Sequence, residues 1–449
     1  MQFTSMAFAV FVLIVFLIYW AVPNKYRMPL LLLVSYGFYM TFSPGYVLLL
    51  IALSLLTYMA GMKCNKAMIT TCVILQVALL LFFKYAGLIP GIREGLVIPV
   101  GISFYIFKAI SYMVDVYGGK IEAEKQIMPL LLYLAFFPDI VSGPINRAQI
   151  LIPQLKAEKE FEYQNAVYGM RLILWGLFKK LLIANTLARY VDQVFALHGA
   201  YLGITYFFVM LFYTIQIYCD FSGYSDMAIG VARLFGITSM ENFKAPYLAA
   251  NIKEFWDRWH MTLSTWLRDY VYFPLGGSRK GKIKTYLNLM ATFLVSGIWH
   301  GANLTFFIWG ALHGVYQMVY RFYRQHCKWK MPRIMGVIIT FLAVSFAWLF
   351  FRAETAYDAV DMIRHMTYNL DPLLAYHKLG MVQRDFWMLI LAIGMLFVYD
   401  AVSVKKDIIV EMDRLNPALR WTIYLMLSAI IVAFHLHNGV SQQFIYFQF

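Results

Sequence analysis

Residues 3–23 read FTSMAFAVFVLIVFLIYWAVP and contain no charged side chain. An α-helix needs about 20 predominantly apolar residues to cross the hydrocarbon core of a bilayer, and this run has that length. It lacks the basic residues that open a secretory signal peptide and the small-residue motif at which one is cleaved. We therefore expect the run to be retained as a first membrane-spanning helix.

The rest of the sequence has the same character. Of its 449 residues, 61% are hydrophobic and only 14% are charged, against about 25% charged residues in ordinary soluble proteins. We therefore predict an all-α polytopic membrane protein, with residues 1–449 in a single integral-membrane domain. About nine to twelve helices should cross the bilayer, accompanied by re-entrant or interfacial helices. The candidate runs are residues 3–22, 28–42, 46–62, 68–88, 98–117, 127–143, 166–186, 200–219, 285–299, 303–323, 334–351, 385–402 and 420–437.

Basic residues indicate the orientation. The connection after the first run carries Lys25 and Arg27, the next turn is uncharged, and the connection after that carries Lys63 and Lys66. Because Lys and Arg accumulate in cytoplasmic loops, this alternation places the N-terminus outside the cytoplasm. The net charge is +14. Two interpretations stay open: an excess of Lys and Arg in the cytoplasmic loops of a protein surrounded by membrane lipid, or a basic site for an anionic donor such as a nucleotide thioester. The basic residues are scattered between apolar runs, which argues against a nucleic-acid partner.

A polar stretch, WDRWHMTLSTWLRDYVYFPLGGSRKGK, interrupts the apolar pattern at residues 256–282. We expect it to begin as a continuous helix, on which His260 lies four residues from both Trp256 and Ser264. Charge on several sides excludes a lipid-facing position. Two interpretations remain open: an amphipathic helix at the cytoplasmic interface, or the wall of a vestibule that attracts an anionic donor. The candidate site residues here are Trp256, Asp257, Arg258, Trp259, His260, Ser264 and Arg268.

One histidine lies inside an apolar run. His300 belongs to LVSGIWHGANLTFFIWGALHG, residues 294–314, and ionisable residues at such depth usually face the interior of a helix bundle. Gly297 and Gly301, four residues apart, favour a close helix crossing beside it. An imidazole with a pKa of about 6.5 is a suitable proton acceptor at neutral pH. The open alternative is a structural histidine bonded to a neighbouring carbonyl, and His313 has the same two interpretations.

Two further groups interrupt the apolar pattern. Asp220 and Ser222 lie in YCDFSGYSDMAIG, where they could orient a histidine, bind substrate hydroxyls or cap the end of a helix. Proline and glycine break the segment FFPDIVSGPINR at residues 136–147, which is a candidate re-entrant or pocket-lining segment. The sequence shows no metal-ligand spacing and no phosphate-binding loop, so we expect no metal site and no permanently bound cofactor.

The stretches EFWDRWHMTLSTWLRDYVYFPLGG and SGIWHGANLTFFIWG resemble the membrane-bound O-acyltransferase (MBOAT) family, and more closely its AlgI-type polysaccharide O-acetyltransferase branch. VIPVGISFYIFKAISYMVDVY, FFPDIVSGPINR and the ending FIYFQF extend the resemblance over most of the chain. It implies a ring of tilted helices around a central funnel. It also implies that His300 is the catalytic base and that His260 is a second histidine at the funnel, with Asn303 among the funnel residues.

The activity implied by the resemblance is transfer of an acetyl group from a cytoplasmic thioester, across a bacterial cytoplasmic membrane, for O-acetylation of an exported polysaccharide. Acetyl-CoA or another acyl thioester would be the donor substrate. Because the sequence shows no soluble domain, an extracytoplasmic partner resembling the SGNH-type AlgJ or AlgX acetyltransferases is implied. Two alternatives stay open: a D-alanyl transferase for teichoic acids, and a transporter without acyl chemistry.

The final aromatic residues, QQFIYFQF, include Tyr446. Similarity to the ending of small partner peptides in the related D-alanylation system makes Tyr446 a candidate covalent acyl relay. An aromatic anchor at the membrane interface is the alternative interpretation.

Overall fold

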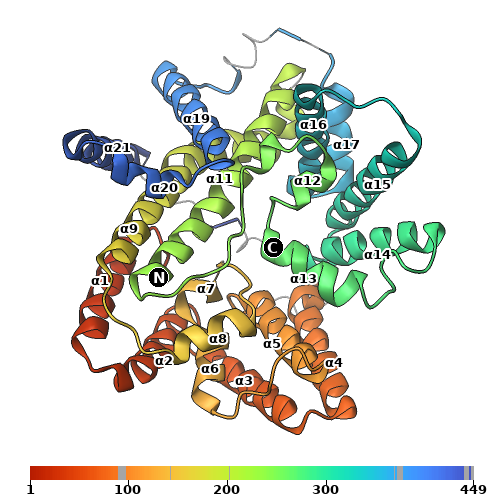
Figure 1. Cartoon of the computed structure of the whole chain (residues 1–449). Helices are drawn as coiled ribbons and strands as arrows, with labels where there is room; N and C mark the ends of the chain where they lie inside the picture. Colours follow the sequence, from red (N-terminus) through yellow and green to blue (C-terminus); the bar gives the residue numbers. More distant parts are fainter. Residues whose placement is uncertain are drawn as a thin grey trace. The chain divides into compact units, whose positions relative to one another are not determined.

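The computed structural model describes residues 1–88, 98–141, 143–201, 203–368, 370–371, 378–438 and 444–445. Throughout these residues the regular secondary structure is helical (Figure 1). The all-α fold class predicted from the sequence is therefore confirmed. Most of the predicted apolar runs coincide with helices to within a few residues, since hydrophobic length is the dominant signal in a membrane-spanning segment.

Contacts between residues group the chain into two compact units. Unit 1 contains Met1–Gly176 and Tyr224–Glu241, and unit 2 contains Leu177–Gly223 and Asn242–Phe449. The long helix α11 (Ile204–Leu234) contributes its first part to unit 2 and its end to unit 1. The single integral-membrane domain expected from the sequence stays a prediction.

Unit 1 is built from the helices of residues 1–176 together with the end of α11. These helices are α1 (Met6–Ala21), α2 (Asn24–Met40), α3 (Tyr46–Lys63), α4 (Lys66–Tyr85), η1 (Ala86–Leu88), α5 (Ile102–Tyr117), α6 (Ile127–Ala135), α7 (Phe137–Ile140), α8 (Ala148–Lys156) and α9 (Tyr163–Leu177).

Unit 2 combines the first part of α11 with helices that precede and follow it in the chain, and it contains the π-helical segments η2 and η5. Its elements are η2 (Phe178–Ala184), α10 (Asn185–Ala196), η3 (His198–Ala200), η4 (Pro246–Leu248), α12 (Ile252–Trp256), α13 (Met261–Leu267), η5 (Arg268–Tyr272), α14 (Lys282–His300), α15 (Leu304–His326), α16 (Arg333–Arg352), α17 (Ala356–His365), α19 (Gln383–Ser403), α20 (Ile408–Glu411), η6 (Met412–Arg414) and α21 (Pro417–Asn438).

Six helices in the described residues are long and apolar enough to cross a membrane. They are α3, α4, α11, α16, α19 and the part of α21 from Pro417 to Phe434. The first run of the sequence forms α1, which is also apolar but has only 16 residues. The count of about nine to twelve crossing helices stays a prediction.

The proline-broken segment of unit 1 folds around a buried carboxylate. α6 ends before Phe136 and α7 has Pro138 in its first turn, so the apolar run expected here divides into two short helices. Asp139 of α7 is fully buried. Its Oδ2 accepts a hydrogen bond from Asn146 Nδ2 at 2.6 Å and lies 3.7 Å from Lys108 Nζ. These contacts bury the broken segment inside unit 1, which is the condition under which non-helical backbone is tolerated at membrane depth.

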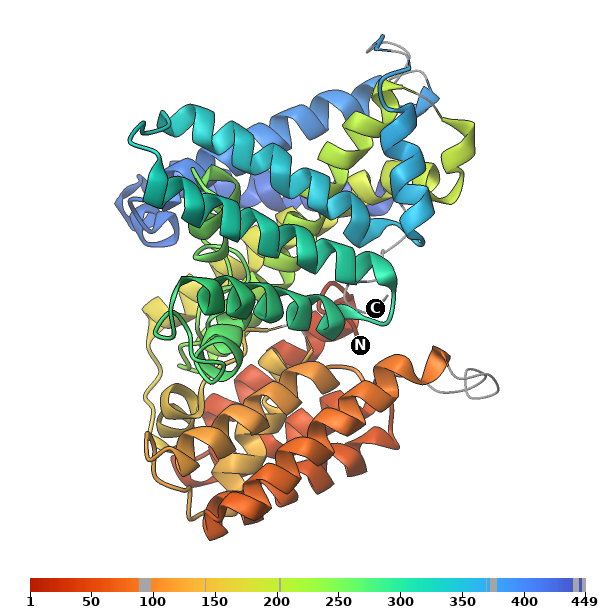
Figure 2. The same ribbon diagram turned by 90° about the vertical axis from the view of Figure 1, so that its right-hand side faces the viewer.

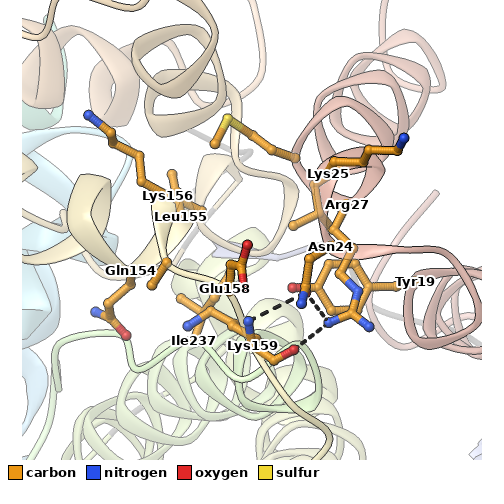
Figure 3. Close-up of a pocket in the computed structure, with 13 residues that line it drawn as sticks. Tyr19, Asn24, Lys25, Arg27, Gln154, Leu155, Lys156, Glu158, Lys159 and Ile237 are labelled. Carbon is orange, nitrogen blue, oxygen red and sulfur yellow. Dashed lines mark hydrogen bonds between the residues drawn. The ribbon is translucent and has the colours of Figure 1, made fainter.

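A polar pocket of about 180 Å³ in unit 1 lies where the start of α2 meets the segment after α8 (Figure 3). Arg27 Nη1 donates to the Asn24 side chain and to the Lys159 carbonyl, each at 2.6 Å, and its Nε donates to the Val22 carbonyl. The guanidinium carbon also lies 4.8 Å from the ring centroid of Trp20. Because Arg27 is bonded within the chain, we assign this pocket a structural role.

In unit 2, α14, α15 and α16 lie side by side (Figures 1 and 2). α14 and α15 approach most closely at two glycines. A Cβ atom on Gly297 would lie 2.4 Å from the Phe306 carbonyl oxygen, and one on Gly310 would lie 2.5 Å from the Phe293 carbonyl oxygen. The two backbones are in contact, so neither position has room for a side chain. His300 is the last residue of α14 and lies directly beyond this crossing.

Candidate active site

The polar stretch does not form the continuous helix that the sequence predicted. α12 ends at Trp256 and α13 begins at Met261. Between them, His260 has a φ of 41°, in the left-handed region that residues other than glycine rarely adopt. The expectation that His260 lies one helical turn from Trp256 and from Ser264 is therefore wrong for Trp256, because the helix is broken between them.

Asn242 holds this left-handed turn. Its backbone carbonyl accepts the Met261 N–H at 2.9 Å, and its Oδ1 accepts the Thr262 hydroxyl at 2.6 Å and lies 3.3 Å from His260 Nδ1. Since an amide oxygen only accepts, this contact places the imidazole proton on Nδ1 and leaves the lone pair on Nε2. Burial lowers the pKa of His260 to about 3, so the ring is neutral at physiological pH.

His300 lies in a box of aromatic rings at the end of α14. Its ring centroid is 4.6 Å from that of Trp299, 5.1 Å from Trp309, 4.9 Å from Phe351 and 6.1 Å from Phe306. These rings come from α14, α15 and α16, so three helices fix the imidazole. The side chain is 4% exposed, which matches the interior position that its apolar run predicted.

Trp299 places the two histidines in one cluster. Its ring centroid lies 4.6 Å from that of His300 and 6.4 Å from that of His260. Phe221 of α11 also packs against His260, with ring centroids 4.6 Å apart and planes perpendicular. The two histidine motifs are therefore neighbours in unit 2, a relationship that their separation in the sequence did not reveal.

An open pocket of about 680 Å³ lies among α12, α13, η5, α14 and α15, and we call it the vestibule. Four of the predicted site residues line it: Trp256, Asp257, Ser264 and Arg268. The charged lining comprises four cations and one carboxylate, a balance of 4 − 1 = +3. The full lining is Lys253, Trp256, Asp257, Met261, Ser264, Thr265, Leu267, Arg268, Tyr272, Leu289, Thr292, Phe293, Gln317, Tyr320, Arg321 and Arg324.

Trp256 connects the vestibule with the histidine cluster. Its indole Nε1 donates to His313 Nδ1 at 3.3 Å, and the ring of Trp309 lies 4.9 Å from His313 and 5.1 Å from His300. Within the described residues, the vestibule lining includes neither His260 nor His300. Trp256, His313 and Trp309 therefore form a continuous row of rings from the vestibule lining to His300, and such rings restrict the access of water to a reactive ester.

Other predicted residues of the polar stretch have packing contacts. Arg258 forms an ion pair with Glu254 at 2.6 Å. Trp259 is buried, with its ring 5.0 Å from those of Phe243 and Trp348, and its carbonyl accepts the Ser264 hydroxyl at 3.1 Å. Neither Arg258 nor Trp259 belongs to the described vestibule lining.

Asn303 caps the start of α15. Its side-chain oxygen accepts the Thr305 N–H, and its Nδ2 donates to the Glu354 carbonyl. It therefore joins the turn after His300 to the end of α16, rather than lining the vestibule.

Asp220 and Ser222 lie within α11, so the helix-capping interpretation is wrong. Two lysines of η2 hold them: Lys180 Nζ is 2.6 Å from Asp220 Oδ1, and Lys179 Nζ donates to the Ser222 hydroxyl at 2.8 Å. The second oxygen of Asp220 accepts the Ile445 N–H at 2.9 Å. Tyr446, the candidate acyl relay, lies outside the described residues.

Asn242, Lys179 and Lys180 were not selected from the sequence. Asn242 precedes the polar stretch in an irregular connection, and the two lysines lie in an otherwise apolar run. An ionisable pair inside an apolar run is a usable signal, because such residues require partners.

Comparison with known proteins identifies the family. The membrane-bound O-acyltransferase family matches residues 31–357, a range that includes both histidine motifs. The chain is 38% identical over 386 residues to a protein of Pseudomonas syringae pv. tomato named "Probable alginate O-acetylase AlgI", with 81% of this chain and 74% of that protein covered.

Two other relatives have different named activities. The peptidoglycan O-acetyltransferase of Helicobacter pylori is 33% identical over 383 residues, covering 75% of this chain and 73% of that protein. The teichoic acid D-alanyltransferase of Bacillus subtilis is 32% identical over 273 residues, covering 57% of this chain and 69% of that protein. The chain therefore belongs to the membrane-bound O-acyltransferase family, where it resembles the AlgI-type branch, and it is a membrane O-acyltransferase.

Proposed function

We propose that this protein moves an acetyl group from a cytoplasmic thioester to a hydroxyl acceptor, for O-acetylation of an exported polysaccharide. The observation that carries the proposal is the buried cluster of His260, Trp299 and His300 behind a basic vestibule. The 38% identity to an alginate O-acetylase over most of the chain supports acetyl as the acyl group.

His300 acts as the general base in this proposal. The hydroxyl oxygen of the acceptor bonds to the thioester carbonyl carbon while its proton passes to His300. The carbon–sulfur bond then breaks, and the leaving thiolate takes that proton, which returns His300 to its neutral form. The aromatic rings around His300 limit competing hydrolysis, because they keep bulk water from the ester. His260, whose ring lies 6.4 Å from that of Trp299, orients the donor.

The vestibule is the proposed donor site. Its excess of cations suits the phosphates of a carrier such as coenzyme A, which Arg321 and Arg324 would bind. Apolar side chains, including Leu289 and Phe293, line the part that would hold the thioester arm. The donor is a substrate that leaves after transfer, so the proposal requires no resident cofactor.

Basic residues support a cytoplasmic position for the vestibule. Lys282 and Lys284 open α14, and Lys328 and Lys330 follow α15. Positive loops of this kind face the cytoplasm. With the N-terminus outside, the enzyme would lie in the bacterial cytoplasmic membrane and pass acetyl groups to an extracytoplasmic SGNH-type partner, similar to AlgJ or AlgX, that acetylates the polymer.

Inside-out membrane vesicles containing the full chain test the proposal. Vesicles receive acetyl-labelled acetyl-CoA or a D-alanyl-labelled carrier protein, and transfer of each label to membrane or lumenal acceptors is measured. We expect transfer from acetyl-CoA, and a loss of 100-fold or more in His300→Ala, the range that general-base catalysis supplies. Transfer from the D-alanyl carrier alone would favour D-alanylation. Movement of an unmodified solute into the vesicle lumen, without acyl transfer, would favour a transporter.

Variants with matched controls test the proposed roles of His300 and Arg321. His326→Ala removes an exposed histidine of α15 that lines neither the vestibule nor the histidine cluster, and it should retain full transfer. Arg321→Gln should raise the KM for acetyl-CoA several-fold with kcat unchanged, because it removes a donor contact made equally before and during reaction. Full transfer by His300→Ala at normal membrane abundance would remove His300 from the base role.

A further inference from the structure

A second open pocket of unit 2, about 950 Å³ in volume, lies between α15 and α16, and we call it the α15–α16 groove. Its walls are largely apolar and aromatic. α15 supplies Val315, Tyr316, Val319, Tyr320 and Tyr323, and α16 supplies Gly336, Ile339, Thr340 and Ala343. α16 is apolar enough to cross a membrane, so its wall of the groove would contact lipid tails.

One end of the α15–α16 groove is basic. Arg324 lies in the last turn of α15, Lys328 and Lys330 lie in the connection, and Arg333 opens α16. Glu254 supplies the one carboxylate of the described lining, so the balance is 4 − 1 = +3. Glu254 Oε1 already lies 3.1 Å from Arg333 Nη2 and 2.6 Å from Arg258 Nη2. This carboxylate therefore does not compensate the charges of the three remaining cations in the described lining.

The connection between α15 and α16 is held in place by Tyr323. The Tyr323 hydroxyl donates to the Trp329 carbonyl at 2.6 Å and accepts the Met331 N–H at 3.1 Å. These two bonds fix the backbone on both sides of Lys330. The basic end is therefore a defined turn above the apolar walls, since its carbonyl and amide groups are anchored to α15.

We propose that the α15–α16 groove binds an anionic glycerophospholipid, with its phosphate at Lys328 and Lys330 and its acyl chains along Val319 and Ile339. Charge complementarity selects this occupant. A free phosphate would leave the apolar walls without a partner, and a zwitterionic lipid would compensate less of the positive charge. Basic pockets at the cytoplasmic ends of membrane helices recognise anionic headgroups in this way.

The lipid site is distinct from the vestibule. Tyr320 and Arg324 of α15 line both, but the remaining vestibule cations, Lys253, Arg268 and Arg321, are absent from the described lining of the groove. The residues proposed to bind the lipid phosphate, Lys328 and Lys330, line the groove and are absent from the described lining of the vestibule, so the test measures lipid binding rather than acyl transfer.

Native mass spectrometry of the purified full chain in a neutral detergent tests the proposal. The protein is titrated with dioleoyl-phosphatidylglycerol or dioleoyl-phosphatidylcholine, which share acyl chains and differ in headgroup charge. We expect the wild type to bind phosphatidylglycerol at least 5-fold more tightly. The variant Lys328→Gln/Lys330→Gln should lose this preference, and Lys328→Arg/Lys330→Arg should keep it.

A charge-matched control is Lys405→Gln/Lys406→Gln, which removes two exposed lysines after α19 and should bind like the wild type. Val319→Trp fills the space along the apolar wall without changing the charge, and it should weaken the binding of both lipids at least 3-fold. Retained preference in Lys328→Gln/Lys330→Gln would overturn the proposal. So would equal binding of the two lipids by the wild type, or displacement of phosphatidylglycerol by millimolar inorganic phosphate. Should the double lysine variant fail to fold, unchanged lipid binding by Val319→Trp would overturn it instead.

Discussion

Lys180 and Asp220 form an ion pair with 2.6 Å between Nζ and Oδ1, and both side chains are almost completely buried. The carboxylate also anchors the N–H of Ile445, and the neighbouring Phe444 ring lies 5.9 Å from that of Phe221. Phe221 in turn contacts His260. The pair thus ties the end of the chain to the part of α11 that supports one of the two histidines.

Removing either partner of this pair should destabilise the protein. Lys180→Met and Asp220→Asn should each lower the unfolding free energy by about 3–5 kcal/mol, because each leaves a buried polar group without its partner. The double variant should cost clearly less than the sum. Thermal unfolding in detergent measures this double-mutant cycle, and additive losses would show that the two side chains act independently.

Trp299→Leu should let water reach the thioester. The smaller side chain removes ring contacts with both His260 and His300, so hydrolysis competes with transfer. We expect the ratio of free thiol released to acetyl transferred to rise several-fold, measured with a thiol reagent and labelled acetyl-CoA in the same vesicles. Trp387→Leu, which changes an exposed tryptophan of α19, is the control and should leave this ratio unchanged.

His260 should make the stability of the protein depend on pH. Its pKa is about 3 in the folded state and about 6.5 when unfolded. Below pH 6.5 the unfolded chain binds a proton that the folded protein does not, so stability falls as the pH drops. Between pH 6.5 and 5 the loss is about 2 kcal/mol.

The variant His260→Asn isolates this effect, because asparagine tolerates the left-handed backbone but does not titrate. Thermal unfolding temperatures at pH 7.5 and pH 5 should differ more in the wild type than in the variant. Equal differences in the two proteins would contradict a buried neutral imidazole at this position.

Gly297→Ala should separate α14 from α15. The added Cβ would lie 2.4 Å from a backbone oxygen, which cannot move aside as a flexible side chain can. We expect a loss of about 1–3 kcal/mol, the usual cost of overpacking, measured by thermal unfolding. Gly394→Ala in α19, where a Cβ meets open space, is the matched control and should be neutral or stabilising. Equal effects of the two variants would show that the crossing is not tight.

The sequence predicted those features that depend on local composition. The apolar runs gave most helices, and the position of His300 within one of them predicted its burial. The break at His260 could not be predicted, because it depends on Asn242, which has no periodic relation to the polar stretch. The partner of Asp220 could not be predicted either. A buried carboxylate indicates that a basic side chain lies nearby, but it does not indicate which of the 38 basic residues this is.

The glycine contact between α14 and α15 has a mechanical consequence. Backbones that touch cannot slide or spread without losing that contact, so these two helices behave as one stiff wall of the vestibule. A change in the width of the vestibule would therefore involve its other lining elements, which are α12, α13 and η5. His260 lies in the connection between α12 and α13, so a movement of these two helices relative to each other would change the backbone angles there.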